Sequence, residues 1–370
     1  MPDHCRVESG AIRPAQPPHR MQPTMPHRLL LALLLALAAF PAQGRPMDEP
    51  IVIAHRGASG ERPEHTLAAY ELAIAQGADV IEPDLVPTRD GVLVARHENN
   101  ITDTTDVAAH PEFAARKTTK TIDGQAQSGW FTEDFTLAEL RTLRAKERLP
   151  ALRKANTAYD GKFTVPTFAE VIALAKKHRV GIYPETKHPS YFASIGLGTD
   201  APLVAALKKA GWDRADAPVF IQSFEVANLK RLKAMTKVRL IQLLDASGGP
   251  ADNAAPSYAA MITPAGLKAI AGYAWGIGAN TGLVVSGEGT PTALVGDAHA
   301  AGLKVHSWTL RAENAFLPAE LRRGSDPAAH GDIAEAIRRQ LAAGVDGFFT
   351  DFPLLGVQAR DAYVTAAKGR

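Results

Sequence analysis

The sequence has few cysteines and few aromatic residues, and each shortage excludes a class of protein. Of its 370 residues the single cysteine is Cys5, so the chain beyond it has no disulfide and no thiol nucleophile. Aromatic residues make up 6% of the chain, and the formal net charge is only +2. No basic run suited to a phosphate backbone is present, so we expect no nucleic-acid partner.

Long apolar runs are also missing, apart from the twelve residues Leu29–Phe40. This run is too short to span a bilayer, and we expect no stable insertion into a membrane. Basic residues before it and small residues after it, at 41–44, are typical of a secretory signal. We therefore interpret residues 1–24 as an upstream extension, 25–44 as a signal peptide and 45–370 as the exported domain. This places the protein in the periplasm or outside the cell, and nothing in the sequence indicates its oligomeric state.

Short β-branched runs recur along residues 45–370, and helix-sized segments separate them. Eight such runs begin near residues 51, 80, 181, 219, 239, 274, 304 and 347. This alternation predicts an α/β fold, a (β/α)₈ TIM barrel rather than an open doubly wound sheet. No G-x-G-x-x-G follows the first run, which argues against a dinucleotide fold. The polar segment at about 98–163 lacks a sustained period and predicts a small subdomain inserted after the second strand.

Charged residues stand at the ends of the predicted strands, which is where the active sites of such barrels lie. His55 and Arg56 end the first run, and a turn at Thr88–Gly91 returns the chain to His97. Displacement at phosphorus needs one group to accept a proton and another to give one, and imidazole does both near neutral pH. His55 and His97 are therefore candidate catalytic residues, with capping or core histidines as the alternative. The planar fork of Arg56 suits an anionic oxygen.

Three carboxylates are candidate metal ligands. Glu82 and Asp84 are two residues apart on an extended chain, so both side chains leave the same face, and Glu185 follows the next strand. Hard oxygen ligands without cysteine favour Ca²⁺ or Mg²⁺ over zinc. The alternative is a buried salt-bridge network with Arg56 and Lys187.

Two more residues are candidates for substrate binding. Lys187 can add a positive charge for an anion, or it can merely neutralise the neighbouring carboxylates. Trp308 can form one wall of the pocket, or it can fill the barrel. The roles of His65 and His306 stay open.

These motifs resemble those of the glycerophosphodiester phosphodiesterases of the periplasmic type. The resemblance rests on IVIAHRGASG, EPDLVPTRDG with His97, YPETK, QSF, VHSWT and GFFTDFP, in that order. It implies a barrel that hydrolyses glycerophosphodiesters to sn-glycerol 3-phosphate and an alcohol. It also implies a divalent cation, Ca²⁺ before Mg²⁺, and the following roles: His55 and His97 as the acid–base pair, Glu82, Asp84 and Glu185 as metal ligands, and Arg56 and Lys187 as phosphate contacts.

One residue departs from the family pattern, and other functions stay open. Pro83 stands between the two carboxylates where related sequences often have Gln or Leu, so the second strand must lack a ladder hydrogen bond or bulge there. A lysophospholipase D or a phosphatidylinositol-specific phospholipase C shares the barrel and the phosphate chemistry. An exported solute-binding protein could hold an anion without turning it over. No charged residue is left over for the alcohol, which predicts little discrimination among headgroups.

Overall fold

The computed structural model describes residues 49–369. The predicted extension at 1–24 and the predicted signal peptide at 25–44 therefore lie outside the described residues. In the part of the chain that is described, no helix combines the length and the apolar character that crossing a bilayer requires.

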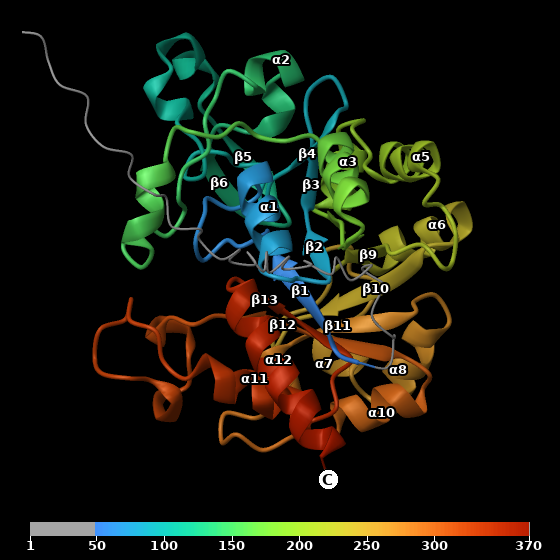
Figure 1. The fold of residues 1–370 in the computed structure, drawn as a ribbon. Coiled ribbons are helices and arrows are strands. Elements are labelled where there is room, and N and C mark those ends of the chain that lie inside the picture. Colours follow the sequence, from blue (N-terminus) through green and yellow to red (C-terminus); the bar gives the residue numbers. More distant parts are fainter. Residues whose placement is uncertain (1–48, 370) are drawn as a thin grey trace, which may run out of the picture. The chain divides into compact units, whose positions relative to one another are not determined.

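Parallel strands of the main sheet close into a barrel. β1 (Ile51–His55) pairs with β13 (Gly347–Thr350) on one side and with β2 (Val80–Glu82) on the other. The remaining strands continue the ring in sequence order, as Figure 1 shows. The fourth to seventh strands are β9 (Phe220–Ser223), β10 (Arg239–Leu244), β11 (Gly276–Asn280) and β12 (Lys304–Leu310). The predicted (β/α)₈ barrel is confirmed.

Two neighbouring barrel strands are interrupted at prolines. The second strand is β2 followed by β3 (Asp84–Pro87), with Pro83 between them, and the third is β7 (Gly181–Ile182) followed by β8 (Glu185–Thr186). β2 pairs with β7 and β3 pairs with β8. Pro83 donates no ladder bond, as the sequence predicts, but its carbonyl accepts one from the amide of Glu185 at 3.0 Å.

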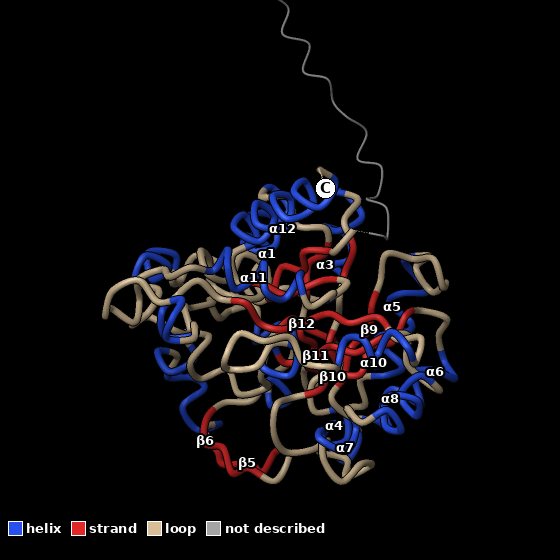
Figure 2. Tube along the Cα trace, turned by 90° about the horizontal axis from the view of Figure 1, so that it is seen from below, coloured by secondary structure: helices blue, strands red, loops and turns tan. Residues whose placement is uncertain are grey.

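Helices surround the strands, which lie in the middle of the molecule in Figure 2. Aliphatic residues fill the space between the two layers. Inside the barrel, a smaller cluster that includes Ile53, Tyr183 and Phe349 forms the packed interior. The longer helices are α1 (Leu67–Ala75), α3 (Phe168–His178), α5 (Asp200–Ala210), α6 (Val226–Met235), α8 (Pro264–Ala271), α10 (Leu294–Ala300), α11 (Ile333–Ala342) and α12 (Pro353–Lys368), and the shorter ones are α4 (Pro189–Ser194), α7 (Tyr258–Met261) and α9 (Thr281–Val284).

The segment between β4 (Leu93–Ala95) and α3 has a hydrophobic cluster of its own, built around Phe113, Trp130 and Phe135. β4 runs antiparallel to β3 after the predicted turn. The segment contains the hairpin β5 (Thr118–Ile122) and β6 (Gln125–Gly129), the short helix α2 (Leu137–Leu140), and the 3₁₀ turns η1 (Val107–Ala109), η2 (Pro111–Arg116), η3 (Thr132–Asp134) and η4 (Lys154–Tyr159). Two further 3₁₀ turns, η5 (Asn314–Phe316) and η6 (Ala319–Leu321), follow β12.

Candidate active site

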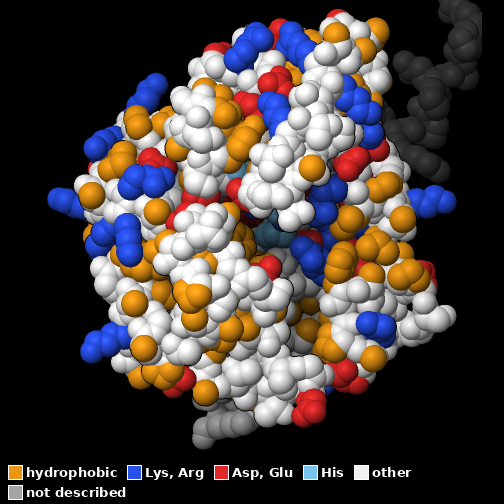
Figure 3. Space-filling model, turned by 180° about the vertical axis from the view of Figure 1, so that it is seen from behind, with side chains coloured by type: hydrophobic (Ala, Val, Ile, Leu, Met, Phe, Trp, Pro, Cys, Tyr) orange, Lys and Arg blue, Asp and Glu red, His pale blue; other side chains and the backbone are white. Residues whose placement is uncertain are grey.

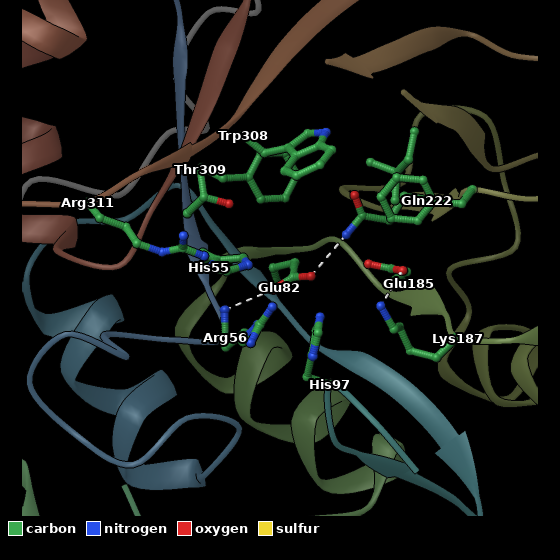
Figure 4. Close-up of a pocket in the computed structure, with 13 residues that line it drawn as sticks. His55, Arg56, Glu82, His97, Glu185, Lys187, Gln222, Trp308, Thr309 and Arg311 are labelled. Atoms are coloured by element: carbon green, nitrogen blue, oxygen red, sulfur yellow. Dashed lines mark hydrogen bonds and ion pairs between the residues drawn. The ribbon is translucent and has the colours of Figure 1, made fainter. Parts of the chain in front are cut away.

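A cavity lies at the carboxyl ends of the barrel strands, where the sequence predicts the site. Figure 3 shows a hollow on one face in which histidine is visible among acidic and basic side chains. Of the eight predicted site residues, all but Asp84 line this cavity, and in Figure 4 their side chains converge on one space. The lining residues are His55, Arg56, Glu82, His97, Glu185, Lys187, Gln222, Phe224, Leu243, Trp308, Thr309, Arg311 and Phe349.

A tight turn after β1 places Arg56 in the site. Arg56 and Gly57 both have positive φ angles, of 61° and 86°. A Cβ atom at position 57 would lie 2.6 Å from the carbonyl carbon of Ala69 in α1, so only glycine fits this close approach. The turn directs the backbone amide of Arg56 at Glu82, to which it donates a 2.8 Å hydrogen bond. The guanidinium of Arg56 also contacts Glu64, at 3.1 Å.

Glu82, Asp84 and Glu185 together could hold a metal ion. One carboxylate oxygen from each lies within 4.8 Å of the others, and all three residues are buried. Asp84 Oδ1 is buried without a hydrogen-bond partner. Burial and the nearby Asp84 raise the pKa of Glu82 well above its usual value. These are the properties of an oxygen donor set that a cation would satisfy.

The pKa of Glu185 is also raised, to about 8. The main cause is burial, which outweighs the opposing charge of Lys187, and Asp84 raises the value further. Lys187 Nζ lies 3.1 Å from Glu185 Oε1. The lysine is therefore already paired with one of the three carboxylates, as the salt-bridge alternative anticipated.

Two buried side chains hold the carboxylates in place. His65, whose role the sequence left open, lies 2.9 Å from Asp84 Oδ2 through Nε2 and 2.8 Å from the Tyr70 hydroxyl through Nδ1. Burial alone would raise the pKa of Asp84, but the hydrogen bond to His65 and the nearby cations hold it well below its usual value. Gln222 Nε2 donates to Glu82 Oε1 at 3.0 Å. Both are positioning residues for the acidic triad.

His55 is held by a carboxylate from the other end of the chain. Its Nδ1 lies 2.6 Å from Oδ1 of Asp351, which directly follows β13. The second oxygen of Asp351 accepts hydrogen bonds from Arg153 and, at 3.0 Å, from Arg311. Burial, aided by Arg56, lowers the pKa of His55 to about 4, so the ring is neutral at neutral pH. With Nδ1 engaged by Asp351, Nε2 is the nitrogen left to accept a proton.

His97 and Trp308 complete the lining on two sides. His97 follows β4 by two residues, and 28% of its side chain is exposed. Burial and the charges of Arg56 and Lys187 lower its pKa well below the usual value. Trp308 donates from its indole nitrogen to the carbonyl of Gly278 at 2.8 Å, which fixes its ring at the edge of the cavity.

Other residues of the site lie outside the sequence prediction. His306 is buried in the barrel interior, where Nδ1 lies 2.8 Å from the Tyr183 hydroxyl, so it is a core residue. Arg311 follows β12 directly and could have been found from its place at a strand end. Arg153 directly precedes η4 in the β4–α3 segment. The sequence of that segment has no apolar periodicity that would have predicted its position.

A closed barrel with histidines, an acidic triad and basic side chains at the carboxyl ends of its strands is the arrangement of a TIM-barrel enzyme. Residues 55–355 match the model of the Glycerophosphoryl diester phosphodiesterase family. The chain belongs to this family.

Individual relatives agree with that assignment, and solved structures share the fold. A glycerophosphodiester phosphodiesterase of Arabidopsis thaliana is 39% identical over 355 residues, covering 88% of this chain and 93% of the relative. One from Haemophilus influenzae is 30% identical over 349 residues, covering 84% and 90%. Among solved structures, an Oleispira antarctica phosphodiesterase in complex with the product sn-glycerol-3-phosphate has a TM-score of 0.59 and 24% identity, covering 85% of this chain and 97% of that one. A glycerophosphodiester phosphodiesterase from Agrobacterium tumefaciens has a TM-score of 0.55 and 20% identity, covering 84% and 99%. These two likenesses show the fold.

Proposed function

We propose that the protein hydrolyses glycerophosphodiesters to sn-glycerol 3-phosphate and an alcohol. The observation that carries this proposal is the meeting of His55, His97, Arg56 and Lys187 in one cavity with two carboxylates of the acidic triad, Glu82 and Glu185. The named activity of the relatives, and the product in the Oleispira antarctica complex, support the same reaction.

The charged residues have distinct tasks in this proposal. Glu82, Asp84 and Glu185 hold a divalent cation, with Ca²⁺ the first candidate and Mg²⁺ the second, and the unpartnered Asp84 Oδ1 supports that fit. Such a cation neutralises charge on the phosphate when it is bound. Arg56 and Lys187 contact the phosphate oxygens. Each of these electrostatic contacts is stronger than in water because the site is largely buried.

The two histidines divide the proton transfers. His55 is neutral and oriented by Asp351, so its Nε2 takes the proton of the attacking oxygen. That oxygen belongs to water, or to the neighbouring glycerol hydroxyl, in which case a cyclic phosphate forms first and water then opens it. His97 gives a proton to the oxygen of the leaving alcohol. Its pKa in the free protein is low because of burial, Arg56 and Lys187, and an anionic phosphate offsets the two positive charges. Substrate binding therefore favours the protonated imidazole that the leaving group needs.

We propose a periplasmic or secreted location, on the signal-like pattern of residues 25–44. Amino-terminal sequencing of the protein recovered from outside the cytoplasm tests this. A product that begins near Arg45 is expected, and a cytoplasmic product that retains Leu29–Phe40 would refute it.

An assay of products tests the reaction. Incubation with glycerophosphoglycerol, glycerophosphocholine and glycerophosphoethanolamine should release sn-glycerol 3-phosphate, detected with a coupled dehydrogenase. With glycerophosphocholine or glycerophosphoethanolamine, release of free glycerol with a phosphorylated alcohol would show cleavage on the other side of phosphorus, as in a phospholipase C. Binding of all diesters without any product would show a solute-binding protein. Turnover of acylated diesters alone would indicate a lysophospholipase D.

A further inference from the structure

A second cavity adjoins the catalytic one and shares Glu185, Lys187 and Phe224 with it. It lies over the ends of β8, β9 and β10 and extends to the β5–β6 turn and the start of α7. We call it the acidic cavity, and its lining residues are Asp123, Glu185, Thr186, Lys187, His188, Phe224, Glu225, Asp245, Ser247, Gly248, Gly249, Ala251 and Tyr258.

Both cations of the acidic cavity are already paired. Lys187 contacts Glu185, and His188 lies between Asp123 at 2.6 Å and Glu98 at 2.8 Å. These two carboxylates raise the pKa of His188 to about 9 despite its burial, so it is cationic and neutralised in place. Both positively charged side chains of the lining therefore lie against carboxylates.

Two carboxylates of the acidic cavity have no cationic partner within residues 49–369. Glu225 is buried and accepts only from Ser190, through its amide at 3.1 Å and its hydroxyl at 2.8 Å. Asp245, directly after β10, accepts through Oδ1 from Asn280 at 2.9 Å and from the amide of Ala246 at 2.7 Å. Neither forms an ion pair in this part of the chain. A cation that enters the cavity can therefore pair with either carboxylate.

Aromatic side chains form one wall of the acidic cavity and connect it with the catalytic cavity. Phe224 packs in a T-shaped arrangement against Trp308, with 5.7 Å between ring centroids, and against Tyr258, with 6.1 Å. Tyr258 is only 6% exposed, and its hydroxyl has no hydrogen-bond partner among the described residues. Burial, together with Asp245 and other carboxylates, raises its pKa, so it stays a neutral hydroxyl. Tyr258 lines the cavity, so its hydroxyl can hydrogen-bond to a bound ligand.

The chemistry of the acidic cavity favours an organic cation over a metal ion. Among residues 49–369, only Glu82, Asp84 and Glu185 bring three ligand atoms within 4.8 Å of one another, so Glu225 and Asp245 form no compact metal site. The faces of aromatic rings, combined with separated carboxylates, are the surroundings in which proteins bind ammonium and quaternary ammonium groups.

We propose that the acidic cavity binds the cationic end of the leaving alcohol, so that the preferred substrates are glycerophosphodiesters whose alcohol carries an ammonium group, such as choline or ethanolamine. This inference rests on the proposed hydrolysis. It reverses the sequence-based expectation of little headgroup discrimination, because the sequence alone does not show that Asp245, Glu225 and Tyr258 line one cavity beside the catalytic one.

Steady-state kinetics on three diesters test the preference. The value of kcat/KM should be at least about tenfold higher for glycerophosphocholine and glycerophosphoethanolamine than for the neutral glycerophosphoglycerol. Asp245→Asn keeps an oxygen acceptor for Asn280 but removes the charge, and it should raise KM for the two cationic diesters about tenfold while leaving glycerophosphoglycerol unchanged. Asp216→Asn, at a surface carboxylate that is 75% exposed, is the matched control and should change none of the three.

Binding of choline tests the same inference without turnover. Calorimetry should show that choline binds the wild-type protein more tightly than its uncharged isostere 3,3-dimethyl-1-butanol, and that Asp245→Asn removes the difference. Tyr258→Phe supplies a second variant, expected to weaken choline binding, should Asp245→Asn fold poorly. Equal kcat/KM for all three diesters, or equal binding of choline and its isostere, would overturn the inference. If no diester released sn-glycerol 3-phosphate, the proposed function would be overturned instead. The choline titration would still show whether the acidic cavity binds an organic cation.

Discussion

Asp351 and His55 are 296 residues apart in the sequence, and their side chains lie 2.6 Å apart at the carboxyl ends of the adjacent strands β13 and β1. The contact fixes one ring nitrogen of the histidine and leaves the other facing the cavity. An acid–base histidine needs such a partner, because the wrong tautomer or ring orientation removes the lone pair from the substrate.

Asp351→Asn should therefore lower kcat by about 10- to 100-fold with little change in KM, since the affected group acts on protons rather than on substrate binding. The measurement is steady-state kinetics across pH. Asp346→Asn is a matched control, because Asp346 makes a similar 2.8 Å contact with His299 at the other end of β13. It should leave kcat unchanged. Equal losses in both variants would show that a general structural effect, and not His55, accounts for the change.

His55→Ala and His97→Ala should each lower kcat by roughly 10²- to 10⁴-fold, the usual contribution of a positioned acid or base. If the two act as a unit, the double variant should be little slower than either single one. A diester with a p-nitrophenolate leaving group, which needs no protonation, should restore part of the rate in His97→Ala but not in His55→Ala. Equal rescue of both variants would refute the assignment of His55 as the base and His97 as the acid. Near-wild-type turnover in either single variant would show that the replaced histidine has a structural role.

Addition of Ca²⁺ to chelator-treated protein should raise the free energy of unfolding, by about 2.7 kcal/mol at a concentration one hundred times the dissociation constant. Asp84→Asn should abolish this gain because it removes one of three charged ligands, whereas Asp216→Asn should keep it. Thermal and urea unfolding with and without the ion measure the effect. Full activity and unchanged stability after chelation would exclude a cation at the triad.

The stability of the protein should fall as the pH drops from 6.5 towards 4, in part because of His306. Burial lowers the pKa of this histidine to about 4 in the folded state, whereas its ordinary value is 6.5. Between these values the unfolded chain binds the proton and the folded one does not, so protonation favours unfolding by about 1.4 kcal/mol per pH unit.

Urea unfolding at several pH values measures this slope. His306→Gln should be less stable at pH 7, because it loses the contact with Tyr183, but its free energy of unfolding should depend less on pH. His178→Gln, at an exposed position at the end of α3, should keep the wild-type slope. An unchanged slope in His306→Gln would contradict the assignment.

The parts of the site that depend on strand ends and on single residues could be predicted from the sequence. The strand ends predicted the positions of His55, Glu82 and Glu185, because in a parallel barrel all carboxyl ends meet at one face. The interruption at Pro83 follows from the missing amide hydrogen.

The remaining parts depend on contacts that no local pattern encodes. Arg153 lies in the β4–α3 segment. The two strands of that segment, β5 and β6, expose most of their side chains, so no alternation of apolar residues marks them in the sequence. Tyr258 looks like any aromatic at a helix start until the fold places it beside Asp245 and Phe224. Partners hundreds of residues apart become visible only when the barrel is closed.

The placement of Arg153 has a consequence for protein engineering. The β4–α3 segment invites exchange with a shorter or longer loop from another barrel, since its hydrophobic cluster is separate from that of the main barrel. Yet Arg153 forms ion pairs with both Glu313, at 2.6 Å, and Asp351, and all three side chains are buried. A graft that omits this arginine would leave Glu313 without its buried cation and Asp351 with Arg311 alone, next to His55. The β4–α3 segment therefore cannot be exchanged independently of the barrel. Any chimaera must supply an arginine whose guanidinium reaches Glu313 and Asp351.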